Sequence, residues 1–418
     1  MIYSKVRKRR VGIITVILYL LLLFDSGFYF VARGGSVLFF QLVLSALLVF
    51  TCKATIPQNS FLALYLLGVL VVIGTTFSDD SIRDIAVSLI ELFSGFCLAC
   101  SFTSKCSKDV EKASRIVMMS ICICSLVAFL LTSLRINLVT KLPVFTSSNN
   151  VRCYFWGLSF SYVPGEYYIA RNLGLFWEPG AFQVYIIIAL IYELFIGGRA
   201  LPKVIYSITI LTTLSSTGII CLLMIWILYG FSIINKRGRG LLLLAVIACV
   251  LSLLYLKMDY LPNSIKFNLI DKIQSIFNGN SRNYVTVSTR MNSVVYGIEL
   301  LLQRPLFGIG RGLSDLRQIA GNNIVSCTPI NWMLQYGIVF GATALIGVYK
   351  FLQRIRCSVM TRIGLFVIIL LSISTEAINI SPTFFFIVFV GFSMKTAENL
   401  HFINRHYCIK RLVKDGKQ

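Results

Sequence analysis

The sequence predicts an all-α, polytopic integral membrane protein of about twelve transmembrane helices, with two long loops on the non-cytoplasmic side. Of its 418 residues, 57% are hydrophobic and 13% are charged, and the mean hydropathy is +0.80. A bilayer needs about 20 apolar residues for each spanning helix, whereas a soluble domain of this size needs far less apolar sequence. Uncharged apolar runs recur along the chain, and Lys and Arg gather in alternate connections between them.

The first apolar run, Val11–Phe30, follows a basic cluster at Lys5 and Arg7–Arg10. This start resembles a signal sequence, but no small-x-small cleavage site follows it and further apolar runs come after. We therefore expect an uncleaved first helix whose basic end lies in the cytoplasm.

Further apolar runs predict the remaining spanning helices. The expected helices are 11–31, 36–52, 60–77, 84–102, 116–133, 180–197, 204–217, 218–234, 240–256, 329–349, 363–377 and 382–396. Residues 204–234 carry no charge, and as one helix they would be about 46 Å long, too long for one comfortable span. Ser215–Gly218 offers a turn in the middle, so we divide this run into a tight hairpin.

The distribution of basic residues supports this count. With twelve helices and both termini cytoplasmic, most Lys and Arg lie inside, in Lys105–Arg115, Lys236–Arg239, Lys350–Arg362 and the tail Lys395–Lys417. This arrangement obeys the positive-inside rule. A single helix over 204–234 would place Lys236–Arg239 outside and the two long loops on opposite faces of the membrane.

The two long outside loops are residues 134–179 and 257–328, and every other connection is short. No separate soluble domain or repeat is visible, so residues 1–418 form one membrane domain. Apolar side chains at helical spacing predict a surface helix over 265–277 and a second helix over 290–303, capped by Ser288 or Thr289.

The segment 171–180, RNLGLFWEPG, places Arg171 and Glu178 at the entrance to the apolar run Ala181–Phe195. Charge near hydrocarbon is costly and tends to mark a site. Pro179 suits a first helical turn, and Glu178 would then sit at the cap, beside the positive end of the helix dipole. An anionic ligand there would meet that dipole and Arg171. The alternative is a capped helix with a structural ion pair.

Both long loops carry an excess of basic side chains. The residues are Arg135, Lys141, Arg152 and Arg171 in the first loop, and Lys257, Lys266, Lys272, Arg282, Arg290, Arg304, Arg311 and Arg317 in the second. This excess indicates an anionic partner, and the planar arginine fork suits phosphate. Binding to anionic lipid headgroups is the alternative. Nucleic acid is not expected, because no basic stripe is interleaved with stacking aromatic residues.

The sequence offers no metal or cofactor site. Both histidines, His401 and His406, lie in the predicted cytoplasmic tail, and most cysteines lie within helices, where they read as packing residues. Cys153 and Cys327 are the cysteines in the outside loops, and a disulfide between them is left open. Three carboxylates lie in or near the predicted spans: Asp25, Glu91 and Glu376. Each is interpreted either as a helix-packing ion-pair partner or as a functional group.

Several short segments, in this order and topology, resemble the bacterial O-antigen and capsule repeat-unit polymerases, which share a superfamily with the O-antigen ligases. They are Arg171–Gly174–Phe176–Glu178–Pro179, Ser215–Thr217–Gly218, Arg290 followed by Pro305–Gly310, and Asn331–Gly341. The resemblance covers about residues 165–345. It departs at Ser216, where many relatives carry arginine.

The resemblance implies an inverting, metal-independent glycosyltransferase with its site on the periplasmic face of the inner membrane. Such enzymes move a growing glycan from undecaprenyl pyrophosphate to a new lipid-linked repeat unit. The implied partners are therefore undecaprenyl-pyrophosphate-linked glycans and the lipid bilayer, and a chain-length regulator is also compatible. No cofactor is implied.

The resemblance also gives the charged residues roles. Arg171 and Arg290, with Arg311 behind them, would stabilise charge on the leaving pyrophosphate, and Glu178 would act as base or orient the acceptor hydroxyl. The further residues expected to bind pyrophosphate or glycan are Arg304, Ser215, Thr217 and Asn331.

Two alternatives remain at this stage. A ligase of the same superfamily is expected to use a periplasmic histidine, which this sequence does not offer. A lipid-linked oligosaccharide flippase or transporter is expected to have short outside loops, broken helices near the midplane and internal repeats, and the sequence shows little of these.

Overall fold

The computed structural model describes residues 2–26, 35–78, 81–134, 141–146, 151–163, 171–234, 282–312, 314, 325–355, 357–378 and 381–393. Side chains are described for these residues except 2–6, 35–36, 233–234 and 282–291. The predicted helices over 240–256 and 265–277 lie outside the described residues.

The first half of the described chain is helical, as predicted. Its helices are α1 (Ile2–Phe24), α3 (Gly35–Cys52), α4 (Gln58–Thr76), α5 (Ile82–Phe102) and α6 (Ser107–Ser133). Helices α1 and α6 both begin earlier than predicted, within charged sequence. Lys, Glu and Arg are good helix formers, and ion pairs bind the two starts: Arg7 to Asp109 at 2.8 Å, and Arg115 to Glu111 one turn before it at 3.2 Å.

The second half contains helices that follow the predicted order with different bounds. They are α7 (Pro179–Tyr192), the π-helical turn η2 (Glu193–Gly197), α8 (Ala200–Thr212), α9 (Ser216–Ile234), α13 (Arg282–Gln303), α15 (Thr328–Tyr336), α16 (Ile338–Leu352), α17 (Val359–Ser374) and α18 (Pro382–Phe392). Helix α13 contains the predicted helix over 290–303 and extends it toward the N-terminus.

The predicted hairpin over residues 204–234 is confirmed. Helices α8 and α9 meet at a turn over residues 213–215 and run antiparallel. Trp226 Nε1 donates to Ser207 Oγ at 3.1 Å, and Lys203 Nζ donates to Tyr229 OH at 3.2 Å. The turn lies slightly before the predicted division.

The prediction of one helix over 329–349 is wrong, because Gly337 divides it into α15 and α16. Gly337 has a φ of 88°, in the left-handed region that glycine tolerates. A Cβ at this position would also overlap the carbonyl of Leu306. The break lets the segment 305–310 pack against the end of α15, where Ile309 N donates to Leu334 O at 2.8 Å.

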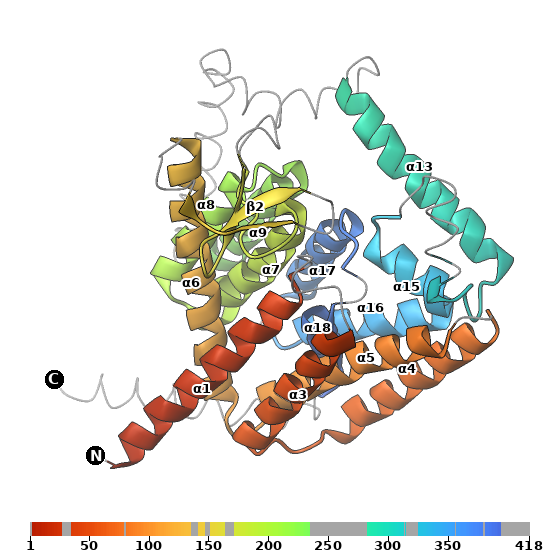
Figure 1. Cartoon of the computed structure of the whole chain (residues 1–418), viewed down its shortest axis with the longest axis horizontal. Coiled ribbons are helices and arrows are strands. Elements are labelled where there is room, and N and C mark those ends of the chain that lie inside the picture. The colour runs from red at the N-terminus through yellow and green to blue at the C-terminus, as the bar shows by residue number, and fades with distance from the viewer. Residues whose placement is uncertain are drawn as a thin grey trace.

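A small antiparallel sheet in the first long loop corrects the all-α prediction. Its strands are β1 (Val144–Thr146), β2 (Arg152–Phe155) and β3 (Phe160–Tyr162), in the order β1-β2-β3. The sheet rests on the ends of two helices, since Thr132 of α6 donates to Ser161 Oγ at 3.0 Å and Tyr19 of α1 donates to the Gly157 carbonyl. Figure 1 shows the strands beside α6.

The apolar helices indicate a membrane protein. Within the described residues, four helical segments are long and apolar enough to cross a membrane: Gln58–Thr76, Ile82–Phe102, Ser107–Ser133 and Pro179–Gly197. Shorter apolar helices accompany them, and many large apolar side chains face outward, such as Phe50 at 78% exposure. The count of about twelve spans stays a prediction.

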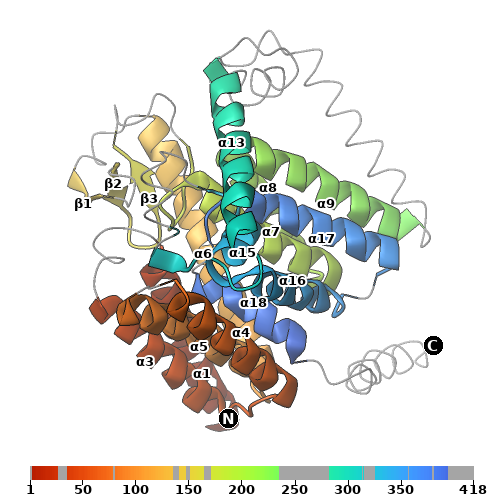
Figure 2. The ribbon, with the colours of Figure 1, turned by 90° about the vertical axis from the view of Figure 1, so that its right-hand side faces the viewer.

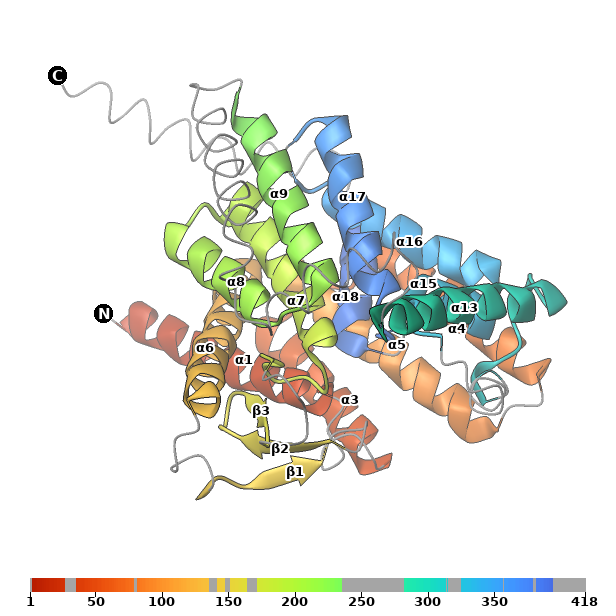
Figure 3. The same cartoon turned by 90° about the horizontal axis from the view of Figure 1, so that it is seen from above.

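Helix α18 lies at the centre of the bundle and packs against α5 and α16. Figure 2 shows α1, α3, α4 and α5 on one side of it and α7, α8, α9 and α17 on another, while Figure 3 shows α13 along the edge beside α15. We call the end that carries the sheet, where α7 and α18 begin, the loop end. The opposite end, where α6 begins among basic side chains, is the basic end.

Candidate functional site

The start of α7, at the loop end, has the predicted backbone arrangement. Pro179 lies in the first turn and Glu178 is the N-cap residue, with an extended φ of −152° and ψ of 156°. The Glu178 side chain does not cap the helix, which corrects that part of the prediction. Its half-buried carboxylate makes no hydrogen bond or ion pair with the described residues.

Arg171 does not pair with Glu178, so the predicted alternative of a structural ion pair is wrong. Its Nε donates to the Thr213 carbonyl at 3.0 Å and its Nη2 to the Leu214 carbonyl at 3.4 Å. These carbonyls end α8, where the backbone lacks intrahelical partners and the dipole is negative. Arg171 is thus held at the α8–α9 turn with a fixed orientation.

The loop between Arg171 and Glu178 is fixed to three helices. The Asn172 amide donates to Ser125 Oγ of α6 at 3.1 Å and to Thr212 Oγ1 of α8 at 3.0 Å. Farther along, Trp177 N donates to the Ser26 carbonyl just beyond α1 at 3.0 Å. The ring of Phe176 stacks on Tyr185 of α7 with centroids 4.5 Å apart. Both charged residues therefore project from a rigid segment.

Ser215 and Thr217 lie beside the carbonyls that Arg171 holds. Ser215 is buried in the α8–α9 turn, where its carbonyl accepts from Ile219 N at 3.0 Å. Thr217 is half-buried in the first turn of α9. The structure therefore groups Arg171, Ser215 and Thr217 at one turn.

A polar cluster around the half-buried Asp25 lies next to this loop, and sequence reasoning did not assign it to the site. Asp25, just beyond the end of α1, accepts hydrogen bonds from Ser381 Oγ at 2.5 Å and from Thr383 Oγ1 and N. Tyr185 OH shares a 2.6 Å hydrogen bond with Ser381 Oγ. Burial raises the pKa of Asp25 to about 6, although hydrogen bonds from Ser381 and Thr383 oppose this shift. A carboxyl that titrates near neutral pH is typical of functional sites.

Glu376 contacts the starts of α7 and α15. It is 3% exposed, and a Cβ on Gly180, in the first turn of α7, would overlap its carboxylate. Its carbonyl accepts a hydrogen bond from Thr328 Oγ1 in the first turn of α15. Asp25 thus lies at the first turn of α18, while the Glu376 carboxylate lies against the first turn of α7. Each helix end presents unpaired N–H groups and a positive dipole.

The remaining predicted residues lie on the far side of α15. Arg311 pairs with Glu91 of α5 at 3.1 Å, with side chains 14% and 7% exposed, and Arg304 donates to the Phe77 carbonyl beyond α4. Asn331 is buried in α15, and its Nδ2 donates to the Val325 carbonyl at 2.6 Å. Arg290 lies in α13, and its side chain is outside the description.

The structure therefore groups Arg171, Ser215 and Thr217 at the α8–α9 turn, and it places Glu178 at the start of α7, in the same loop as Arg171. It links Arg304, Arg311 and Asn331 to α4, α5 and α15, with Glu376 and Thr328 between the two groups. Two sequence signals could have identified the missed cluster. Asp25-Ser26 interrupts the first apolar run, and Ser381-Pro382 has the form of a helix start.

The arrangement suits acid–base chemistry on an anionic substrate. The Glu178 carboxylate has no partner among the described residues, Arg171 is a fixed cation, and the N-terminus of α7 favours negative charge. The disulfide between Cys153 and Cys327 that the sequence left open is not formed. Comparisons of this chain with protein-family models, with curated proteins and with solved structures find no match.

Proposed function

We propose that this protein is a membrane glycosyltransferase that polymerises undecaprenyl-pyrophosphate-linked repeat units into O-antigen or capsular polysaccharide. One observation carries the proposal: Glu178 stands half-exposed at the N-terminus of α7, uncommitted to the described residues, in a loop that also fixes Arg171. A carboxylate with a purely structural role would be expected to have a partner, because an unpaired charge near hydrocarbon is costly. Glu178 has none among the described residues, which leaves it available to a substrate hydroxyl.

The proposed reaction uses these residues as base and as charge stabilisers. Glu178 accepts the proton of the acceptor hydroxyl as that oxygen bonds to the anomeric carbon of the donor sugar. The bond from this carbon to the pyrophosphate oxygen breaks on the opposite face, which inverts the anomeric configuration. Undecaprenyl pyrophosphate leaves with the electron pair, and Arg171 and Arg290 stabilise the developing charge.

Arg304 and Arg311 support this site through contacts with neighbouring helices. The guanidinium groups of Arg304 and Arg311 hold the segment after α13 against α4 and α5. We propose that this anchoring places α13, and with it Arg290, over the substrate. Ser215 and Thr217 lie at the turn held by Arg171, where they can meet glycan hydroxyls.

The proposed setting is the bacterial inner membrane. About twelve spans with both termini in the cytoplasm would place the loop end in the periplasm, where lipid-linked repeat units are exposed. The basic side chains at the start of α6 support this orientation through the positive-inside rule. A chain-length regulator remains a compatible partner, and the bilayer supplies the donor and acceptor lipids.

A lipid-linked oligosaccharide flippase is the second candidate. A cavity of about 220 Å³ opens toward the basic end, and Tyr185 and Thr383, next to the candidate site, line its inner part. Most of its lining side chains are apolar, which does not suit a hydroxyl-rich glycan. The flippase therefore ranks below the polymerase. The ligase ranks lower still, since the sequence predicts no periplasmic histidine.

The glycan profile of a strain lacking this gene tests the proposal. Lipopolysaccharide from the deletion strain and from the complemented strain would be separated on a gel. A polymerase predicts that the deletion leaves a single repeat unit on the lipid core and that complementation restores the ladder. A core without any repeat unit would contradict a polymerase and indicate a ligase or a flippase.

A further inference from the structure

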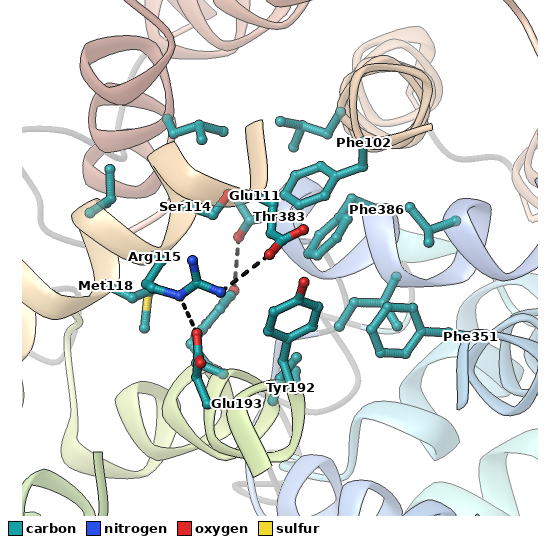
Figure 4. Close-up of a pocket in the computed structure, with 18 of the residues that line it drawn as sticks. Phe102, Glu111, Ser114, Arg115, Met118, Tyr192, Glu193, Phe351, Thr383 and Phe386 are labelled. Atoms are coloured by element: carbon teal, nitrogen blue, oxygen red, sulfur yellow. Dashed lines mark hydrogen bonds and ion pairs between the residues drawn. The ribbon is translucent and has the colours of Figure 1, made fainter. Parts of the chain in front are cut away.

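The basic end of the bundle contains a cavity that the proposed reaction does not use. Its volume is about 220 Å³, and its walls come mainly from α1, α5, α6, α7 and α18. Apolar side chains make up most of them, including Leu18, Met118, Ala189 and Phe386. At its inner part Thr383 donates to Tyr185 OH at 3.1 Å. Figure 4 shows the cavity with its charged side chains on one side and aromatic rings on the other.

The mouth of the cavity carries a buried ion-pair network. Arg115 of α6 lies between Glu111, at 3.2 Å, and Glu193 of η2, and it pairs with both (Figure 4). Glu193 is 2% exposed in its side chain and Arg115 is 11% exposed, whereas Glu111 is 39% exposed. Glu111 is therefore the carboxylate of this network that solvent and ligands can reach. The π-helical turn η2 that presents Glu193 is a rare conformation found often at functional sites.

A second arginine lines the same mouth without an acidic partner among the described residues. Arg354 follows the end of α16, and its Nη2 donates to Ser393 Oγ at 2.9 Å. No described carboxylate lies within 4.0 Å of it. Burial lowers its pKa to about 10, so it remains charged at neutral pH. An arginine withdrawn from water without a counter-ion favours an anionic ligand group.

The charges at the mouth define what such a ligand must carry. The positive charges of the two arginines equal the negative charges of the two glutamates. Tyr192 lies near both Arg354 and Glu111. A purely anionic headgroup would satisfy Arg354 but would meet the exposed carboxylate of Glu111. A zwitterionic headgroup satisfies both, provided that its cation can donate hydrogen bonds. A primary ammonium can do so, whereas a choline group has no N–H.

We propose that this cavity binds a phospholipid with an ethanolamine headgroup. One acyl chain fills the apolar cavity, the phosphate binds Arg354, and the ammonium binds Glu111. Apolar walls beneath a charged mouth fit an amphiphile that enters tail first. In the orientation proposed above, the lipid comes from the cytoplasmic leaflet, but binding itself does not depend on that orientation.

Native mass spectrometry of the purified full-length protein in detergent tests this site. Ethanolamine, choline and glycerol phospholipids with identical acyl chains would be titrated separately. The ethanolamine lipid should bind about tenfold more tightly than the other two, as expected for one added charged hydrogen bond. Inorganic phosphate at millimolar concentration should not displace it, because the acyl chain supplies much of the affinity.

Four variants assign the contacts. Glu111→Gln should reduce ethanolamine binding to the level of choline, and Arg354→Gln should weaken both. Ala189→Phe should block the cavity and remove binding of all three lipids. Lys350→Gln, one turn earlier and placed over the Phe392 ring at 4.7 Å, should change nothing. Each variant would first be shown to elute as the folded protein.

Three results would overturn the proposal. Equal affinity for the three lipids, unchanged by Glu111→Gln, would remove the headgroup assignment. Binding that survives Ala189→Phe would place the lipid elsewhere on the bundle. Displacement by inorganic phosphate would show a site for free anions instead.

Discussion

At the loop end, the surroundings of Asp25 change the chemistry of its carboxyl group. Burial raises its pKa to about 6, so the folded protein binds a proton more tightly than the unfolded chain does. Stability from this group is therefore complete at low pH and is lost as the pH rises through about 6. The hydroxyls of Ser381 and Thr383 hold the carboxyl in place in either state.

Asp25→Asn should remove this pH dependence. Asparagine still accepts hydrogen bonds from Ser381 and Thr383 but cannot ionise. The melting temperature of the wild type in detergent should fall between pH 5 and pH 7.5, and the variant should lose most of that difference and be the more stable protein at pH 7.5. A wild type that becomes more stable over this range would show that the Asp25 carboxylate is stabilised instead.

Arg311 and Glu91 form a second residue-scale test, because a buried ion pair and a substrate-binding arginine respond differently to substitution. Arg311→Gln removes the charge partner of the buried Glu91 and should destabilise the protein by about 3–5 kcal/mol. The double variant Glu91→Gln/Arg311→Gln should recover most of this stability and most of the activity. Recovered stability without activity would mean that Arg311 contacts the substrate directly.

At the scale of elements, the close approach of α7 to Glu376 controls how the site is assembled. A Cβ on Gly180 would overlap the Glu376 carboxylate, whereas Gly12 in α1 has open space around it. Gly180→Ala should therefore cost about 1–3 kcal/mol through overpacking and lower activity, while Gly12→Ala should be tolerated and slightly stabilising, because alanine favours a helix. Thermal unfolding of both variants in detergent measures the difference. Equal tolerance of the two substitutions would mean that α7 and Glu376 are not in contact.

Most helices could be predicted from apolar runs, because a run of suitable length has few alternatives in a membrane. The predicted helix bounds were wrong where interactions outside the apolar run determine where a helix begins or ends. Charged residues extend α6 through ion pairs to Glu111 and Asp109, and Gly337 ends α15 because the Leu306 backbone passes there. The sheet over residues 144–162 was missed, since its strands are only three or four residues long.

Only those features of the candidate site that depend on residues close in sequence could be predicted. Pro179 and Glu178 follow the rules for a helix start, so their backbone positions were predicted correctly. The partners of Arg171 are carbonyls 42 and 43 residues away, and no local pattern reveals them. Likewise Asp25 meets Thr383 across 358 residues, so that cluster depends on the packing of α1 against α18.

At the scale of the whole molecule, the proposed function needs both long loops on one face. Reporter fusions at Asn150 and Asn280, one in each loop, would be compared in the native membrane. Both fusions should report the periplasm, because the hairpin of α8 and α9 returns the chain to the cytoplasm and the predicted helix over 240–256 then crosses the membrane again before the second loop. Opposite locations would contradict the topology of about twelve spans and would separate Arg290 from Glu178.

The central claim is that Glu178 promotes glycan polymerisation. Purified protein in vesicles would be given undecaprenyl-pyrophosphate-linked repeat units, and the products would be separated by size. The wild type and the control Glu299→Gln, an exposed glutamate of α13, should produce a ladder of chains. Glu178→Gln, at equal abundance and stability, should lower the rate about 10²–10⁴-fold and produce no long chains. A full ladder from Glu178→Gln would contradict the assignment.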